Sequence, residues 1–246
     1  MPRTHAPVSP GQERLLWLHE LDPDSDAYHI FLPVLFQKGV DRPALDRSLA
    51  RLVDRHPVLT VRFVREPSGA VTQTTTPDFR VPVEELPAPT SDDWERAARS
   101  IMAAPFALFT SPSPRVALIR CGDGSDVAVL ALHHTVGDGR SMRTLHHDLT
   151  AFYRHETGGA RPDLPQLSAD YLSFAALTRP VRAVVRTARP GRPTGGRRCA
   201  GSSPLRSRRT RPGPKGTRTP SRSAGSSSRP KAPGPWSSWH SGAVRP

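Results

Sequence analysis

The 246-residue sequence has no aspartate or glutamate after Asp170, although 17 of its 35 Lys and Arg residues lie beyond that position. Up to Asp170, the 22 acidic residues outnumber 18 basic ones, so the formal net charge of +13 comes from the second segment alone. Only three aromatic residues follow Tyr171, which leaves that segment with too little apolar surface for a core. The chain therefore divides into two unlike parts.

Long apolar runs and cysteine pairs are also missing. No apolar stretch approaches the roughly 18 residues of a membrane span, and the first residues lack the apolar segment of a secretory signal. Cys121 and Cys199 cannot form a disulfide framework, and neither has the CxxC partner that is typical of zinc sites. We therefore expect a reduced, cytoplasmic, soluble protein that holds no metal.

The first 170 residues carry the periodicity of a folded domain. Apolar residues at helical spacing predict four helices: one opened by Ser9, one capped by Asp41, one over 91–104 and one over 142–153. Strands are predicted over 29–36, 58–64, 71–76 and 79–83, with a hairpin of 115–121 and 126–133. Pro33 favours an edge position or a bulge for the first of these strands. This irregular order favours a mixed α/β layer over a regular doubly wound sheet.

Two histidines end the last predicted strand. Adjacent strand residues point to opposite faces, so His133 and His134 are expected to do different jobs, and at most one lies in a given cleft. A histidine at a strand end can accept a proton near pH 7, which suits general-base work. The following loop holds a carboxylate, Asp138, and a flexible Gly139. A structural role for both histidines is the alternative.

Three separated segments carry short motifs in order: SPGQERLLWL at 9–18, RHPVLTVRF at 55–63 and HHTVGDG at 133–139. They resemble the SxAQxRLWxL, RHExLRTxF and HHxxxDG motifs of the condensation domains of nonribosomal peptide synthetases, which have the chloramphenicol acetyltransferase-like fold. Asp170-Tyr171 similarly resembles the segment that follows the family's histidine-motif helix. The resemblance covers residues 8–178 and is limited to the N-terminal lobe of a two-lobed domain.

The resemblance implies an α/β fold, an α+β sandwich in which helices lie against a mixed β-sheet over 8–178. It also implies a reaction in which peptidyl or acyl carrier protein domains present thioesters on phosphopantetheine arms and an amide forms. His134 would lie at the centre of the tunnel between the lobes and accept the proton of the attacking amine or stabilise the intermediate. His133, Asp138 and Gly139 complete the motif: Asp138 is expected to be structural and Gly139 to let the backbone pass close to the tunnel. No cofactor is expected to bind directly.

The second motif departs from the family pattern, because Thr60 stands where the family has an arginine. Arg62 shares a face of the predicted strand with Thr60, so Arg62 is the candidate partner of Asp138. The alternative is that Arg62 is simply solvated. Arg140 stands where many members carry an aromatic residue, which leaves the substrate class open.

The basic segment over 179–246 is rich in Pro, Arg, Ser and Gly and is expected to be a disordered tail. It is either an arm that binds nucleic acid by counterion release, or the product of an out-of-frame reading of GC-rich codons. Its lack of acids and its start inside a domain favour the frameshift, so we do not expect nucleic-acid binding.

Because no sequence for the family's second lobe is found, we expect little or no activity from the chain alone. A separate C-terminal lobe is then a candidate partner, beside the carrier domains, and membrane partners are not expected. Two other functions stay open. One is a free-standing acyltransferase of the same fold that uses an alcohol or a coenzyme A thioester. The other is a non-catalytic protein whose basic tail acts on its own.

Overall fold

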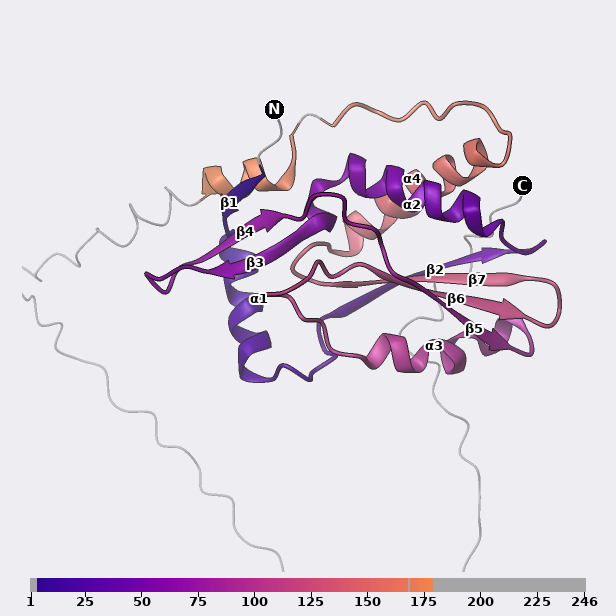
Figure 1. Cartoon of the computed structure of the whole chain (residues 1–246), viewed down its shortest axis with the longest axis horizontal. Helices are drawn as coiled ribbons and strands as arrows, with labels where there is room; N and C mark the ends of the chain where they lie inside the picture. Colours follow the sequence, from indigo (N-terminus) through magenta and orange to yellow (C-terminus); the bar gives the residue numbers. More distant parts are fainter. Residues whose placement is uncertain (1–3, 168, 179–246) are drawn as a thin grey trace, which may run out of the picture. The chain divides into compact units, whose positions relative to one another are not determined.

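The computed structural model describes residues 4–167 and 169–178. In these residues, helices and strands form two separate β-sheets with helices beside them (Figure 1). The prediction of a mixed α/β architecture is confirmed, with the strands divided over two sheets instead of one. The tail predicted over 179–246 lies outside the described residues.

The smaller sheet has three antiparallel strands in the order β1 (His5–Pro7), β4 (Val71–Thr75) and β3 (Val61–Arg65). Helix α1 (Pro10–Leu21) starts directly after β1. It opens with the predicted capping box, in which the Ser9 N–H donates to Gln12 Oε1 (3.0 Å) and the Gln12 N–H donates to Ser9 Oγ (3.2 Å). Because both of these N–H groups have a hydrogen-bond partner, the capping box fixes the start of α1, which is also the start of the first motif.

The larger sheet has the order β2 (His29–Phe36), β7 (Asp126–His133), β6 (Arg115–Cys121) and β5 (Val83–Ala88). Strand pairs β2–β7 and β6–β7 are antiparallel, as the predicted hairpin requires, whereas β5 runs parallel to β6. Strand β2 lies at the edge, which confirms the position expected from Pro33, since a residue without an N–H cannot serve two neighbours.

Helices cover both faces of the larger sheet. Helices α2 (Arg42–Arg55) and α4 (Gly139–Glu156) pack on one face, and α3 (Trp94–Ala103) packs on the other (Figure 1). All eight residues of β7 are therefore buried, and its alternate side chains serve the two cores. Ala128, Leu130 and Leu132 face α2 and α4, while Val127 and Val129 face α3.

Two predicted strands differ from the structure. Residues 58–60 belong to a 3₁₀ turn, η1 (Pro57–Thr60), because Pro57 fixes its own φ and its carbonyl accepts the Thr60 hydroxyl at 2.9 Å. Strand β5 begins at Val83, later than predicted, because Pro82 has no N–H and only its carbonyl pairs, with the Val116 N–H at 2.8 Å.

A last helix occupies residues 171–178 (Figure 1). Asp170 precedes it and accepts the Ser173 N–H at 2.7 Å. The Tyr171 hydroxyl lies 2.8 Å from Ser9 Oγ, and Leu172 is buried in the core between α1 and the smaller sheet. The segment after the histidine motif is thus joined to the first motif.

Candidate functional site

The two histidines at the end of β7 have opposite environments. His133 continues the alternation of Val127 and Val129 and is 1% exposed, whereas His134 is exposed. The His134 N–H donates to the Tyr28 carbonyl at 2.8 Å, which holds its backbone just beyond the sheet. The prediction that the pair divides between two faces is confirmed.

A cavity of about 590 Å³ lies beside His134. Five stretches of chain border it, namely residues 11–15, 55–59, 134–138, 141–145, and 167 together with 169–174. The three sequence motifs and the Asp170-Tyr171 segment therefore meet at one place, although Ser9 and Tyr171 are 162 positions apart in the chain. His134 and Asp138 line this cavity, and His133 does not.

His133 lies among aromatic and imidazole rings. The ring centroids of His19 and His29 are 5.6 and 6.1 Å from that of His133, and Phe106 lies at 6.0 Å. Burial, followed by repulsion from the neighbouring histidines, lowers the pKa of His133 to about 3. The ring is thus neutral at physiological pH, and its Nδ1 accepts the Thr135 N–H at 3.2 Å. His133 fixes the start of the loop that carries His134.

Asp138 is the N-cap of α4. One of its oxygens, Oδ1, accepts the N–H groups of Arg140 (3.1 Å) and Ser141 (2.8 Å) and the Ser141 hydroxyl (2.8 Å). These hydrogen bonds, those from Ser141 first, hold the pKa of Asp138 below its usual value. Gly139 follows as the first residue of α4, and a Cβ added there would meet no atom within 4 Å.

The structure does not bring Arg62 and Asp138 together. Arg62 lies on β3 and lines a different cavity with Glu20 and Phe109. Among the described residues, no ion pair includes Arg62, and the contacts of Asp138 are to the first turn of α4.

A network that the sequence reasoning missed borders the cavity. Asp148 on α4 is 2% exposed, and its Oδ2 lies 2.9 Å from Arg55 Nε and 2.8 Å from His56 Nε2. Burial alone raises the pKa of Asp148, but hydrogen bonds from His56, His147 and Arg55 outweigh it and lower the pKa. The sequence did hold a signal for this network, because Asp148 lies on the same helix face as the apolar residues Leu145 and Leu149.

Gln12 is a second residue whose role at the cavity was not predicted from the sequence. Beyond its part in the capping box, the buried side chain donates from Nε2 to Gln73 Oε1 (2.9 Å) and to the Thr135 carbonyl (3.2 Å). Helix α1, the smaller sheet and the loop after β7 are therefore joined at one amide. The sequence indicated only the cap.

In the part of the chain that the structure describes, no three His, Cys, Asp or Glu side chains are arranged to hold a metal ion. Over the same residues, no helix combines the length and the apolar character needed to cross a bilayer.

Comparison with known proteins identifies the family and the fold. The family model for the condensation domain matches residues 2–182. This chain belongs to the condensation domain family. Relatives include a linear gramicidin synthase of Brevibacillus parabrevis, 32% identical over 179 residues, and a probable non-canonical nonribosomal peptide synthetase, CymA, of Salinispora arenicola, 35% identical over 176 residues. These matches cover 70% and 71% of this chain and 2% of each relative.

Solved condensation-domain structures have the same fold. The first condensation domain of the calcium-dependent antibiotic synthetase, in complex with a substrate analogue, superimposes with a TM-score of 0.62 at 22% identity, covering 74% of this chain and 44% of that one. The X-domain in complex with OxyB from teicoplanin biosynthesis gives a TM-score of 0.66 at 20% identity, covering 76% of this chain and 40% of that one. This condensation-family chain spans less than half of either solved chain.

Proposed function

We propose that this chain provides the N-terminal lobe, with its histidine wall, of a site that forms amides between carrier-bound thioesters. The observation that carries the proposal is the exposed His134, which lies in a cavity bordered by all three sequence motifs. Family membership supports the reaction class, and the relatives named above are peptide synthetases.

His134 would act on the attacking amine. As the amine nitrogen bonds to the thioester carbon, the C–S bond breaks, the amine gives up a proton, and the thiolate leaves as a thiol once it is protonated. A neutral imidazole can take that proton or hold the nitrogen while the tetrahedral intermediate forms. A thioester is already activated, so much of the acceleration can come from orienting two tethered reactants.

The neighbours of His134 have positioning roles in this proposal. Asp138 fixes the first turn of α4, and His133 fixes the other end of the loop through Thr135. The loop between β7 and α4 is therefore held at both ends, which fixes the backbone of His134 beside the cavity. Arg62 is left without a part in the site.

The substrates would arrive on phosphopantetheine arms of peptidyl or acyl carrier domains, and a second lobe would close the cavity. Leu167 and Phe174, which border the cavity, are 42% and 51% exposed. Apolar side chains of this size at a cavity rim are expected where another surface covers them. The chain alone is therefore expected to give little or no turnover.

A carrier protein whose pantetheine arm ends in a chloroacetamide tests the proposal on the chain as it is. Attack by the imidazole nitrogen on the chloromethyl carbon forms a C–N bond, releases chloride and gives the imidazole proton to solvent. Mass spectrometry should find the label on His134, and His134→Ala should abolish it. His147→Ala, which removes an imidazole whose side chain is 66% exposed, should leave the label in place.

Equal labelling of His134 and His147 would mean that the cavity does not guide the arm, and it would overturn the proposal. A separate turnover assay uses donor and acceptor thioesters on their carriers. Robust amide formation by the chain alone would overturn the need for a second lobe without touching the role of His134.

A further inference from the structure

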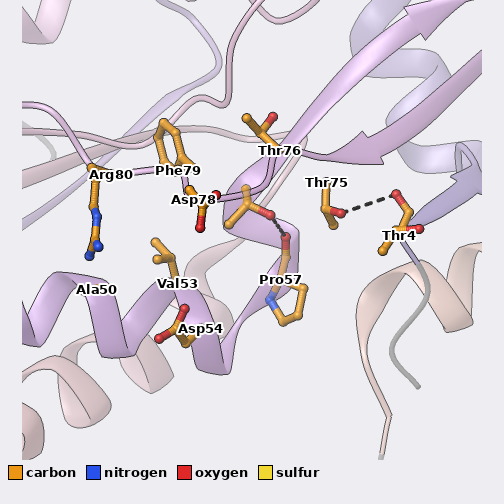
Figure 2. A pocket seen from close by; sticks show the side chains of 11 residues that line it. Thr4, Ala50, Val53, Asp54, Pro57, Thr75, Thr76, Asp78, Phe79 and Arg80 are labelled. Atoms are coloured by element: carbon orange, nitrogen blue, oxygen red, sulfur yellow. Dashed lines mark hydrogen bonds between the residues drawn. The ribbon is translucent and has the colours of Figure 1, made fainter.

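The structure has a second cavity, of about 430 Å³, and Figure 2 shows the side chains that line it. Helix α2, the turn η1, the end of β4 and the loop over 76–80 border it. Of the residues that the structure describes, Pro57 alone lines both cavities. Neither the motifs nor the proposed amide formation gives this second cavity a role.

Three charged side chains line this cavity, and none of them has an ion-pair partner among the described residues. Figure 2 shows Asp78 and Arg80 reaching from the loop after β4 toward α2, where Asp54 is located. Among the described residues, none of these three side chains forms an ion pair or a hydrogen bond. The cavity thus offers two carboxylates and one guanidinium to whatever enters it.

Three of the threonine hydroxyl groups that line the cavity differ in their hydrogen bonding. Thr60 Oγ1 donates to the Pro57 carbonyl at 2.9 Å, and Thr75 Oγ1 donates to the Thr4 carbonyl at 3.4 Å. Thr76 Oγ1 is buried and has no partner among the described residues. Because solvent does not reach this oxygen, a ligand in the cavity does not contact it, and the groups open to a ligand are the charged side chains.

The remaining lining is apolar. Val53 is 4% exposed, and the ring of Phe79 is partly buried against the core behind it. Together with Ala50 and Pro57 they give a wall suited to a short aliphatic side chain. The volume falls within the range of small-ligand sites.

We propose that this cavity binds a free α-amino acid with an aliphatic side chain. Its ammonium group would bind Asp78 and Asp54, its carboxylate would bind Arg80, and its side chain would lie against Val53 and Phe79. A bare metal cation fits less well, because the guanidinium repels it. A nucleotide or another polyanion fits less well, because the two carboxylates repel it. A zwitterion matches both signs.

Calorimetry on the full chain with L-leucine tests this site. L-Leucinamide lacks the carboxylate and N-acetyl-L-leucine lacks the ammonium group, so each should bind at least about tenfold more weakly than leucine. Arg80→Gln should weaken leucine binding by a similar factor and remove the preference over leucinamide. Asp78→Asn should reduce the preference over N-acetyl-leucine, because Asp54 still faces the ammonium group. Asparagine tolerates the left-handed backbone of Asp78 (φ 53°), so this variant keeps the loop.

Two controls separate the site from general effects. Arg96→Gln removes an exposed arginine of α3, and His134→Ala alters the other cavity, so both should bind leucine as the parent does. No heat of binding, equal binding of the three compounds, or indifference to Arg80→Gln and Asp78→Asn would overturn the proposal. The proposed amide formation would be unaffected by any of these results.

Discussion

The imidazole Nε2 of His56 lies 2.8 Å from Oδ2 of Asp148, so the C-cap residue of α2 is attached to the buried side of α4. Arg55 Nε reaches the same oxygen at 2.9 Å. The second sequence motif begins with these two residues, and α4 follows the third motif. One carboxylate therefore fixes the relative position of the two motifs at the cavity that contains His134.

Asp148→Ala should destabilise the fold by about 3 kcal/mol, because it leaves the partly buried guanidinium of Arg55 without a counter-charge and the imidazole of His56 without its partner. Urea denaturation at neutral pH measures the loss. Asp46→Ala is the matched control: it also removes an aspartate that pairs with an arginine, Arg42, but at the surface. This control should cost less than about 1 kcal/mol. Equal losses of unfolding free energy in the two variants would show that burial of the Asp148 network adds nothing to stability.

The elements that local sequence controls were predictable. The Ser9 cap, the strand pair 115–121 and 126–133, and the division of His133 from His134 follow from capping, turn and alternation rules, which act over a few residues. The prolines caused the errors: Pro57 starts a 3₁₀ turn inside a predicted strand, and Pro82 delays β5. An apolar run does not show where a missing N–H shifts the pairing.

The site was predictable only in part, because its contacts are long-range. His134 was found because the histidine motif is local. The bonds of Gln12 to Gln73 and Thr135 span 61 and 123 positions, and no pattern within one segment predicts them. The pairing expected between Arg62 and Asp138 assumed that Thr60 belonged to a strand. The 3₁₀ turn at Thr60 removes that premise.

Gln12→Met should cost about 2 kcal/mol and loosen the loop after β7. Methionine has a similar volume but cannot replace the bonds to Ser9, Gln73 and Thr135, and it leaves buried polar groups without partners. Urea denaturation gives the free energy of unfolding, and amide exchange at Val136 reports on the loop. Gln166→Met, at an exposed position, should change neither quantity. If both variants behaved alike, Gln12 would not hold the loop.

Asp138→Ala should destabilise the chain by about 1 kcal/mol through loss of the α4 cap, while Asp138→Asn should keep most of the stability because asparagine also caps helices. Arg62→Ala should stay within about 0.5 kcal/mol of the parent, because this partly buried side chain has no ion pair to lose among the described residues. Thermal or urea unfolding of the single and double variants measures these values. A coupling energy between positions 62 and 138 well above about 0.5 kcal/mol would instead support an ion pair between them.

Stability should fall as the pH drops below 6.5, and His133 should account for a distinct part of the fall. In the unfolded chain, His133 takes up a proton near pH 6.5, but in the folded chain its pKa is about 3. Its contribution is therefore complete above pH 6.5 and decreases by about 1.4 kcal/mol for each pH unit on the way down toward pH 3. The lowered pKa values of His19 and His29, each due first to burial, add to the same slope.

The slope itself is the measurement that identifies His133. Urea unfolding at intervals between pH 6 and 4 should give a slope for His133→Gln that is shallower than the parent's by about one proton. Glutamine can still accept the Thr135 N–H, so the loop keeps its anchor. His5→Gln, at the exposed first residue of β1, removes an imidazole elsewhere and should leave the slope unchanged. A parent-like slope in His133→Gln would mean that this ring takes up its proton in the folded chain as readily as in the unfolded one. In that case the buried ring cluster would not be what makes the fold acid-sensitive.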